Sequence, residues 1–160
     1  MGVGKSTFAK HISTSLNRLY IDTDQLIETS YGASVSDIFA SQGEAYFRKM
    51  ESQVFDFLLP THNACLSLGG GFPIYTQRSV KELGVVVYLR DSIDNILSRL
   101  SDEQIAQRPL LQDRQKATEL FGTRQEIYEQ NSHIVLSIKN HSIDQLAELF
   151  FAKLKELNLK

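Results

Sequence analysis

Four short apolar runs alternate with longer stretches of helical periodicity, and this alternation limits the chain to few folds. The runs span Leu19–Asp22, Ala64–Leu68, Gly84–Leu89 and His133–Ile138. Strands separated by helices predict right-handed crossovers and therefore an α/β fold with a parallel sheet. Because ligands bind at the carboxyl ends of the strands in such sheets, we expect the functional residues just after each run.

Three helical patterns lie between and around these runs. Apolar residues recur at every fourth position over residues 8–16. The sequence Ser41-x-x-Glu44 has the form of a capping box and predicts a helix over residues 41–59. The sequence Ser142-x-x-Gln145 predicts the start of the last helix in the same way.

Residues 2–7 combine glycines, a lysine and hydroxyl side chains directly before the first helical pattern. The segment reads Gly2-Val3-Gly4-Lys5-Ser6-Thr7. Glycines let backbone N–H groups turn toward phosphate oxygens, and a following helix adds the partial positive charge of its N-terminus. In the phosphate-loop pattern G-x-x-x-x-G-K-[S/T], the lysine contacts the β- and γ-phosphates and the last hydroxyl ligates Mg²⁺. The segment therefore predicts a nucleotide-binding loop with Lys5 and Ser6 in these roles.

Part of this pattern is missing at the start of the chain. The first glycine would lie before Met1, and the strand that normally leads into the loop is absent as well. Loss of a strand from inside a sheet would leave backbone groups of its neighbours unpaired, which is costly when they are buried. We therefore expect Met1 to be an internal methionine, preceded by that strand and glycine. The alternative to a phosphate loop is that residues 2–7 form a flexible N-terminal tail.

Two carboxylates follow the first apolar run, at the end where ligands are expected. Asp22 and Asp24 flank Thr23. One carboxylate can hold Mg²⁺ through its water shell, and a second can orient or deprotonate an attacking hydroxyl. The alternative is that Asp24 merely caps the next helix. The phosphate loop at the preceding junction favours the chemical role.

An ion pair and a triple glycine mark the middle of the chain. Arg48 and Glu51 lie three residues apart, which allows either a solvated ion pair or an arginine that Glu51 orients toward a substrate carboxylate. Ser67, near the end of the second run, precedes Gly69-Gly70-Gly71. Three consecutive glycines indicate a ligand lying against bare backbone, although a wide turn would also use them.

Two arginines in the second half of the chain suit a charged ligand. Arg108 lies in a polar stretch, and we expect a lid over about residues 101–116. A closing lid would exclude water and bring Arg108 to the transferring phosphoryl group. Arg124 lies four residues before Tyr128. Taken alone, each arginine is equally compatible with an ordinary surface position.

Composition excludes several classes of protein. The net charge of −2 argues against a protein held to nucleic acid by bulk charge. No apolar run approaches the length of a membrane helix, and no signal peptide is recognisable. The single cysteine, Cys65, rules out an internal disulfide and fits a reducing compartment. The four histidines lack metal-ligand spacing. We expect a cytoplasmic protein with neither nucleic acid nor membrane as a partner.

Taken together, these motifs resemble the shikimate kinase family, small phosphate-loop kinases of aromatic amino-acid biosynthesis. Their order and spacing follow the family through the chain, and only the N-terminal strand and the first loop glycine depart from it. The matching residues are Gly4-Lys5-Ser6-Thr7, Asp22-Thr23-Asp24, Gly43-Glu44, Phe47-Arg48, Glu51, Leu66-Ser67-Leu68-Gly69-Gly70-Gly71, Arg108-Pro109-Leu110, Arg124 and Tyr128.

The resemblance implies a fold and a reaction. The fold is a single three-layer α/β kinase domain over residues 1–160, with a lid and a five-stranded parallel sheet in the order 2-3-1-4-5, whose first strand is the missing one. The reaction transfers the γ-phosphoryl group of ATP to the 3-hydroxyl of shikimate with the help of Mg²⁺, in the shikimate pathway to chorismate.

The resemblance also assigns roles by position. Catalysis falls to Lys5, Asp24 and Arg108. The nucleotide is bound by Gly2, Val3, Gly4, Lys5, Ser6, Thr7 and Arg108, with the adenine placed near Lys139 and Asn140. The metal is held by Ser6 and Asp22. Shikimate is bound by Asp24, Arg48, Gly69, Gly70, Gly71 and Arg124.

Two other interpretations remain open at this stage. One is a phosphate-loop kinase for another small hydroxy acid, such as gluconate. The other is a non-catalytic nucleotide-binding module, because the loop is incomplete. The sequence leaves the oligomeric state undetermined, with a monomer as the working expectation.

Overall fold

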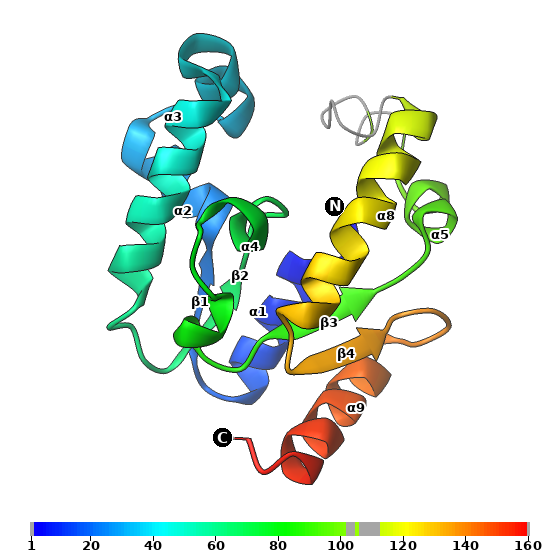
Figure 1. The fold of residues 1–160 in the computed structure, drawn as a ribbon. Coiled ribbons are helices and arrows are strands. Elements are labelled where there is room, and N and C mark those ends of the chain that lie inside the picture. The colour runs from blue at the N-terminus through cyan, green and yellow to red at the C-terminus, as the bar shows by residue number, and fades with distance from the viewer. Residues whose placement is uncertain (1, 102–104, 106–112, 160) are drawn as a thin grey trace. The chain divides into compact units, whose positions relative to one another are not determined.

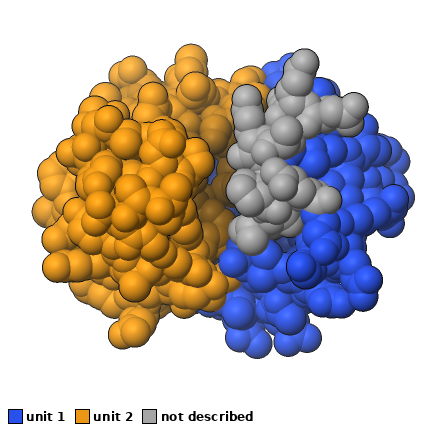
Figure 2. All heavy atoms as spheres, turned by 90° about the horizontal axis from the view of Figure 1, so that it is seen from above, with its two compact units in different colours: residues 1–4, 85–160 blue, residues 5–84 orange. Residues whose placement is uncertain are grey.

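The computed structural model describes residues 2–101, 105 and 113–159. The chain divides into two compact units, which Figure 2 distinguishes by colour. One unit contains residues 5–84, and the other contains residues 1–4 together with 85–160. Each unit holds one two-stranded parallel sheet. The single kinase domain expected over residues 1–160 stays a prediction.

The unit of residues 5–84 is built on two parallel strands (Figure 1). Strand β1 pairs with β2 so that Asp22 lies opposite Ser67, which brings the two carboxyl ends level. Helix α1 packs against both strands, α2 packs against β1 and α3, and α4 packs against α3. The bounds are α1 Lys5–Ser15, β1 Leu19–Asp22, α2 Thr23–Tyr31, α3 Val35–Leu58, β2 Ala64–Ser67, α4 Phe72–Tyr75 and the 3₁₀ helix η1 Val80–Leu83.

Buried apolar side chains hold these helices in place. They come from every helix of the unit: Phe8, Ile12, Ile27, Ile38, Phe47, Phe55, Leu58, Phe72 and Val80. Full burial of one such side chain contributes about 1.5–3 kcal/mol, so the packed helices are firm supports for the polar residues at their ends.

Two helix starts differ from the capping that the sequence suggested. Asp22, rather than Asp24, caps α2, because its carboxylate accepts hydrogen bonds from the backbone N–H groups of Asp24 and Gln25. The capping box expected at Ser41 is wrong, since α3 already begins after Ser34 and the Ser41 hydroxyl donates to the carbonyl of Asp37. A kink at Gly43, with φ of 80°, interrupts the helix instead, a conformation that favours glycine.

The second unit repeats the parallel pairing with different strands. Strand β3, Val87–Arg90, pairs with β4, Ile134–Ser137, and Arg90 lies opposite Ser137. The described residues of this unit also form helices α5, α8 and α9, and α9 packs against β4. Their bounds are α5 Ile93–Ser98, α8 Arg114–Gln130 and α9 Ile143–Glu156. The capping box of Ser142 and Gln145 at the start of α9 is confirmed.

All four apolar runs are confirmed as strands, with shifts at the ends of three of them. The run at Gly84–Leu89 is the most displaced, because its strand covers Val87–Arg90. The pairs β1-β2 and β3-β4 correspond to the pairs 2-3 and 4-5 of the expected order. The count of five strands stays a prediction. Among the described residues, no helix is long and apolar enough to cross a membrane.

Candidate active site

Three oxygen-bearing side chains meet at the carboxyl ends of β1 and β2. The Ser6 hydroxyl, in the first turn of α1, donates to Oδ2 of Asp22 at 2.9 Å. Ser6 Oγ also lies 3.2 Å from Ser67 Oγ. The strand register places Asp22 beside Ser67, and α1 packs across both strands, so the fold itself assembles this cluster.

Hydrogen bonds favour the ionised form of Asp22. Burial alone raises the pKa of Asp22, but hydrogen bonds from Ser6, Ser67, the Gln25 amide and Tyr20 outweigh burial, and the pKa lies below its ordinary value. The Tyr20 hydroxyl donates to Oδ2 at 3.0 Å. Asp22 therefore stays ionised and can bind a positively charged group.

The donor set suits one kind of metal. Described residues contain no group of three histidine, cysteine, aspartate or glutamate side chains that could hold a metal ion. One carboxylate with two hydroxyls provides only hard oxygen ligands. Mg²⁺ prefers oxygen and keeps several waters, completing its shell with phosphate oxygens of a substrate. The residues present therefore fit Mg²⁺ carried on a nucleotide.

Asp24 has the opposite electrostatic character, although it lies only two residues from Asp22. Burial raises the pKa of Asp24, and the neighbouring charge of Asp22 raises it further, while Lys5 and Arg48 act in the opposite direction. A carboxylate with a raised pKa is better matched to accept a proton near neutral pH. The two aspartates are thus differentiated by their surroundings.

The glycine segment after β2 runs against two of the predicted site residues. The buried Thr23 hydroxyl accepts a hydrogen bond from the backbone N–H of Gly69 at 2.9 Å, which ties this segment to α2. A Cβ atom on Gly69 would overlap the carboxylate of Asp24. A Cβ atom on Gly71 would overlap the guanidinium of Arg48. A larger residue at either position would displace the end of that side chain, because the backbone and the side chain approach closely.

Arg48 is held between two carboxylates of its own helix. Its Nη1 donates to Oε2 of Glu51 at 2.7 Å, and its Nε and Nη2 donate to Oε1 of Glu44 at 3.1 and 2.8 Å. The Arg48 side chain is 19% exposed, whereas that of Glu51 is 1% exposed. The interpretation as a solvated ion pair is therefore wrong, and Glu51 orients Arg48 from a buried position.

Burial also changes the acidity of Glu51. It raises the pKa of Glu51, and the hydrogen bond and charge of Arg48 offset only part of this effect. A buried carboxylate of this kind depends on its arginine partner, because an unpaired buried charge is strongly destabilising.

The predicted phosphate loop has the backbone conformation that its glycines allow. Gly2 and Gly4 have φ values of 66° and 92°, in the left-handed region. Helix α1 begins immediately afterwards at Lys5. Val3 lies between the two glycines, and Thr7 lies in the first turns of α1 with Ser6.

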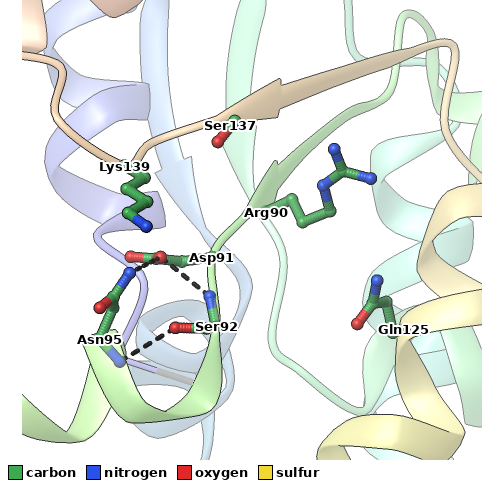
Figure 3. A pocket seen from close by; sticks show the side chains of 7 residues that line it. All are labelled: Arg90, Asp91, Ser92, Asn95, Gln125, Ser137 and Lys139. Atoms are coloured by element: carbon green, nitrogen blue, oxygen red, sulfur yellow. Dashed lines mark hydrogen bonds between the residues drawn. The ribbon is translucent and has the colours of Figure 1, made fainter.

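The second unit contains a polar hollow of about 290 Å³ at the carboxyl ends of β3 and β4 (Figure 3). The buried carboxylate of Asp91 lies at one side, where it accepts hydrogen bonds from Asn95 Nδ2 and the Ser92 amide, both at 2.8 Å, and pairs with Arg99. The lining residues are Arg90, Asp91, Ser92, Asn95, Gln125, Ser137 and Lys139. Lys139 therefore lines the hollow, whereas its neighbour Asn140 does not.

Two of the predicted arginines, Arg124 and Arg108, are not among residues 5–84, the unit that contains Arg48. Arg124 is buried in α8, in the unit that contains residues 85–160. Its convergence with Arg48 on one carboxylate stays a prediction. Arg108 and most of the expected lid lie outside the described residues.

The structure adds three residues that the sequence interpretation did not single out for the site. Tyr20 contacts Asp22, and the period of two along a strand could have indicated it. Glu44 contacts Arg48 at the helical spacing of four, although the sequence pattern placed it in a capping box and in the family match, with no role in the site. Tyr75 lies with its ring centroid 3.9 Å from Cζ of Arg48. No pattern in the sequence points to this contact.

Comparisons with known proteins agree with this geometry. The family model described as shikimate kinase matches residues 1–155. A shikimate kinase of Helicobacter hepaticus is 40% identical over 138 residues, which cover 86% of this chain and 81% of that protein. A shikimate kinase of a Sulfurihydrogenibium species is 34% identical over 158 residues, covering 97% of this chain and 93% of that protein.

Solved structures give the same result. Shikimate kinase from Acinetobacter baumannii in complex with shikimate superposes with a TM-score of 0.89 at 30% identity, covering all of this chain and 91% of that one. The enzyme from Aquifex aeolicus superposes with a TM-score of 0.85 at 30% identity, covering 99% and 94%. The chain therefore belongs to the shikimate kinase family of ATP-dependent phosphotransferases.

Proposed function

We propose that this protein transfers the γ-phosphoryl group of ATP to the 3-hydroxyl of shikimate, in the shikimate pathway that leads to chorismate. Shikimate is a small acid with three hydroxyls, so its site needs a cation for the carboxylate and a base for the attacking hydroxyl. Family membership and the bound shikimate of the Acinetobacter baumannii relative support this substrate.

One observation carries the proposal. The glycine segment 69–71 lies against the carboxylate of Asp24 at one end and against the guanidinium of Arg48 at the other. A proton acceptor and a carboxylate-binding cation thus border the same stretch of bare backbone. A hydroxy acid lying on Gly69, Gly70 and Gly71 would meet both groups, with Arg48 on its carboxylate and Asp24 on its hydroxyl.

The cluster of Ser6, Asp22 and Ser67 supplies the metal half of the site. We propose that Ser6 and Asp22 hold Mg²⁺, which neutralises phosphate charge when bound, and that Ser67 orients one of its waters. Lys5 and the turns at Gly2 and Gly4 bind the phosphates. Phosphoryl transfer requires chiefly positioning and charge neutralisation, so these groups suffice alongside Asp24.

The remaining assignments complete the proposal. Arg124 is the second carboxylate-binding arginine, and Arg108 is the group that a lid brings to the phosphates. The adenine lies near Lys139 and Asn140, which the hollow beside β4 supports through Lys139. We propose a cytoplasmic monomer, which sedimentation of the purified protein would check.

A coupled ATPase assay with ³¹P NMR of the product tests the function. We expect Mg²⁺-dependent formation of shikimate 3-phosphate and no turnover with gluconate. Methyl shikimate, which lacks the charged carboxylate, should be a poor substrate. Phosphorylation of gluconate in preference to shikimate would contradict the proposal. Tight ATP binding without transfer to either acceptor would support a non-catalytic nucleotide-binding module instead.

The assignment of Lys5 has its own test. Replacement of Lys5 by Met keeps the length of the side chain but removes its charge, so kcat should fall strongly. Near-normal turnover of this variant would remove Lys5 from the reaction.

A further inference from the structure

We propose that Tyr75 is a positioning residue that holds the Arg48 guanidinium and thereby sets the affinity for the carboxylate of the substrate. The inference rests on the proposed function, because it takes Arg48 as the carboxylate-binding group. Tyr75 is the last residue of α4, the short helix that follows the glycine segment. Its ring is the nearest of the three recorded around Arg48.

The distances distinguish Tyr75 from the other aromatic neighbours. Cζ of Arg48 lies 3.9 Å from the centroid of the Tyr75 ring, compared with 5.6 Å for Phe39 and 5.4 Å for Phe47. A guanidinium over an aromatic face is attracted by the ring quadrupole, and arginine stacks on such faces through its planar group. Tyr75 therefore makes the closest face contact.

The carboxylates alone do not fix the guanidinium plane. Glu44 and Glu51 accept hydrogen bonds from its nitrogens, and these bonds lie near the plane of the group. With only these two carboxylates as partners, the guanidinium plane could still tilt about the line that joins Glu44 and Glu51. Contact with a ring at Cζ, the centre of the group, opposes that tilt. Tyr75 thus supplies the restraint that the two glutamates lack.

Helix α4 connects this restraint to the substrate-binding backbone. The backbone N–H of Tyr75 donates to the carbonyl of Gly71 at 3.0 Å, so the two residues lie one helical turn apart. Gly71 itself passes close to the guanidinium. One short turn therefore presents both the glycine backbone and the aromatic ring to Arg48.

A fixed plane matters for the recognition of a carboxylate. Arginine has five N–H donors in one plane, and the bonds to Glu44 and Glu51 use one donor on each of its three nitrogens, which leaves two donors for a ligand. A planar carboxylate forms two parallel hydrogen bonds only when it is coplanar with the donors. Loss of Tyr75 should therefore weaken binding of the acid without slowing the transfer of the phosphoryl group.

Steady-state kinetics of Tyr75→Leu and Tyr75→Phe test this role. We expect Tyr75→Leu to raise KM for shikimate by about two- to fivefold, in line with the strength of a partly exposed cation–π contact. The values of kcat and of KM for ATP should stay unchanged. Tyr75→Phe keeps the aromatic face and should behave as the wild type. An unchanged KM for shikimate in Tyr75→Leu would overturn the inference.

Tyr46 provides a matched control. It lies on α3 and, like Tyr75, is 38% exposed, but its recorded ring partner is Tyr31. Tyr46→Leu should leave KM for shikimate unchanged. An increase equal to that of Tyr75→Leu would indicate a general loss of packing and would count against a specific role of Tyr75.

A double-mutant cycle separates this inference from the proposed function. In an Arg48→Ala background, Tyr75→Leu should have no further effect on KM for shikimate, because the group that it positions is gone. Additive effects would overturn the positioning role while leaving Arg48 in the site. No change in KM on Arg48→Ala alone would refute the carboxylate-binding role of Arg48 and the inference with it.

NMR measures the contact between Tyr75 and Arg48 directly, and it thereby distinguishes loss of this contact from other causes of a raised KM for shikimate. The Nε–H proton of Arg48 should show a ring-current shift in NMR spectra of the wild type and of Tyr75→Phe. The shift should become smaller in Tyr75→Leu, where only the more distant rings of Phe39 and Phe47 remain. An undiminished shift in folded Tyr75→Leu would contradict the stacking on which the inference depends.

Discussion

Arg48 and Arg78 contact the same kinds of group, but the partners of the two arginines differ in burial. Each guanidinium bonds two carboxylates and lies over an aromatic ring: Arg48 with Glu44, Glu51 and Tyr75, and Arg78 with Asp56, Glu82 and Phe55. Glu51 is 1% exposed, whereas Asp56 and Glu82 are 69% and 43% exposed. Only Arg48 lies against a glycine backbone.

The difference shows that burial decides what an ion pair can do. Exposed pairs gain little, because water and salt screen their charges. A buried partner such as Glu51 holds its arginine in one orientation and cannot leave it without cost. Arg48 is therefore held in one orientation, while Arg78 belongs to an ordinary surface network.

The largest expected difference concerns stability. Glu51→Ala leaves the arginine without its buried partner and opens a gap in the core, so we expect a loss of about 3 kcal/mol in the free energy of unfolding. Glu82→Ala, at the exposed arginine, should leave the unfolding transition nearly unchanged. Urea unfolding monitored by circular dichroism measures both variants. Equal losses of stability in Glu51→Ala and Glu82→Ala would show that burial of the glutamate does not distinguish the two arginines.

The next effect concerns substrate affinity. Arg48→Ala should raise KM for shikimate by about 10- to 100-fold, because a charged hydrogen-bond partner contributes roughly 1.5–3 kcal/mol. Arg78→Ala should leave KM unchanged. Initial-rate assays at saturating ATP measure KM for shikimate in both variants. Thermal unfolding checks that both variants are folded. If both variants have the KM of the wild type, the carboxylate site lies elsewhere.

A pH dependence of stability should follow Glu51. Burial raises the pKa of Glu51 above its ordinary value of 4.5, so the folded protein holds this proton more tightly than the unfolded chain. Protonated Glu51 therefore contributes to the free energy of unfolding. This contribution is complete below the pKa of Glu51 in the unfolded chain and is lost as the pH rises from about 4.5 through the raised pKa of the folded protein.

Replacement of Glu51 by glutamine tests this pH dependence. Glu51→Gln should flatten this part of the pH dependence relative to the wild type. Unfolding midpoints measured across the acidic range give the slope for each protein. An unaltered slope in Glu51→Gln would assign the dependence to other groups.

The smallest effect concerns salt. Screening by added salt should remove the coupling between Arg78 and Glu82, because both side chains are exposed. The coupling between Arg48 and Glu51 should persist, since one partner is buried. Double-mutant cycles at low and high salt concentration measure each coupling. Equal salt sensitivity would contradict the proposed difference between the two arginines.

Candidate site residues could be named from the sequence because several of them follow strand ends, where ligands bind in a parallel sheet. The order of Lys5, Asp22, Asp24, Arg48 and the triple glycine indicated a kinase for a small acid through its resemblance to the family. The strand–helix alternation likewise predicted all four strands. Strand ends and the start of α3 were less predictable, because neighbouring hydrogen bonds compete with capping residues.

Other features depend on contacts between distant segments. The sequence allowed Arg48 and Glu51 to be either an exposed pair or an oriented clamp, because spacing along a helix does not specify which face is buried. It gave Asp22 and Asp24 different roles, but it did not indicate that their surroundings shift their pKa values in opposite directions.

The chain's own order of residues determined the class of fold and indicated the candidate reacting groups, because both follow from periodicity and chemical type. Tertiary structure decided which groups are buried, which carboxylate carries a raised pKa, and that Tyr75 covers Arg48. These properties arise when separate helices and strands exclude water around a side chain, and exclusion of water is a property of the packed molecule.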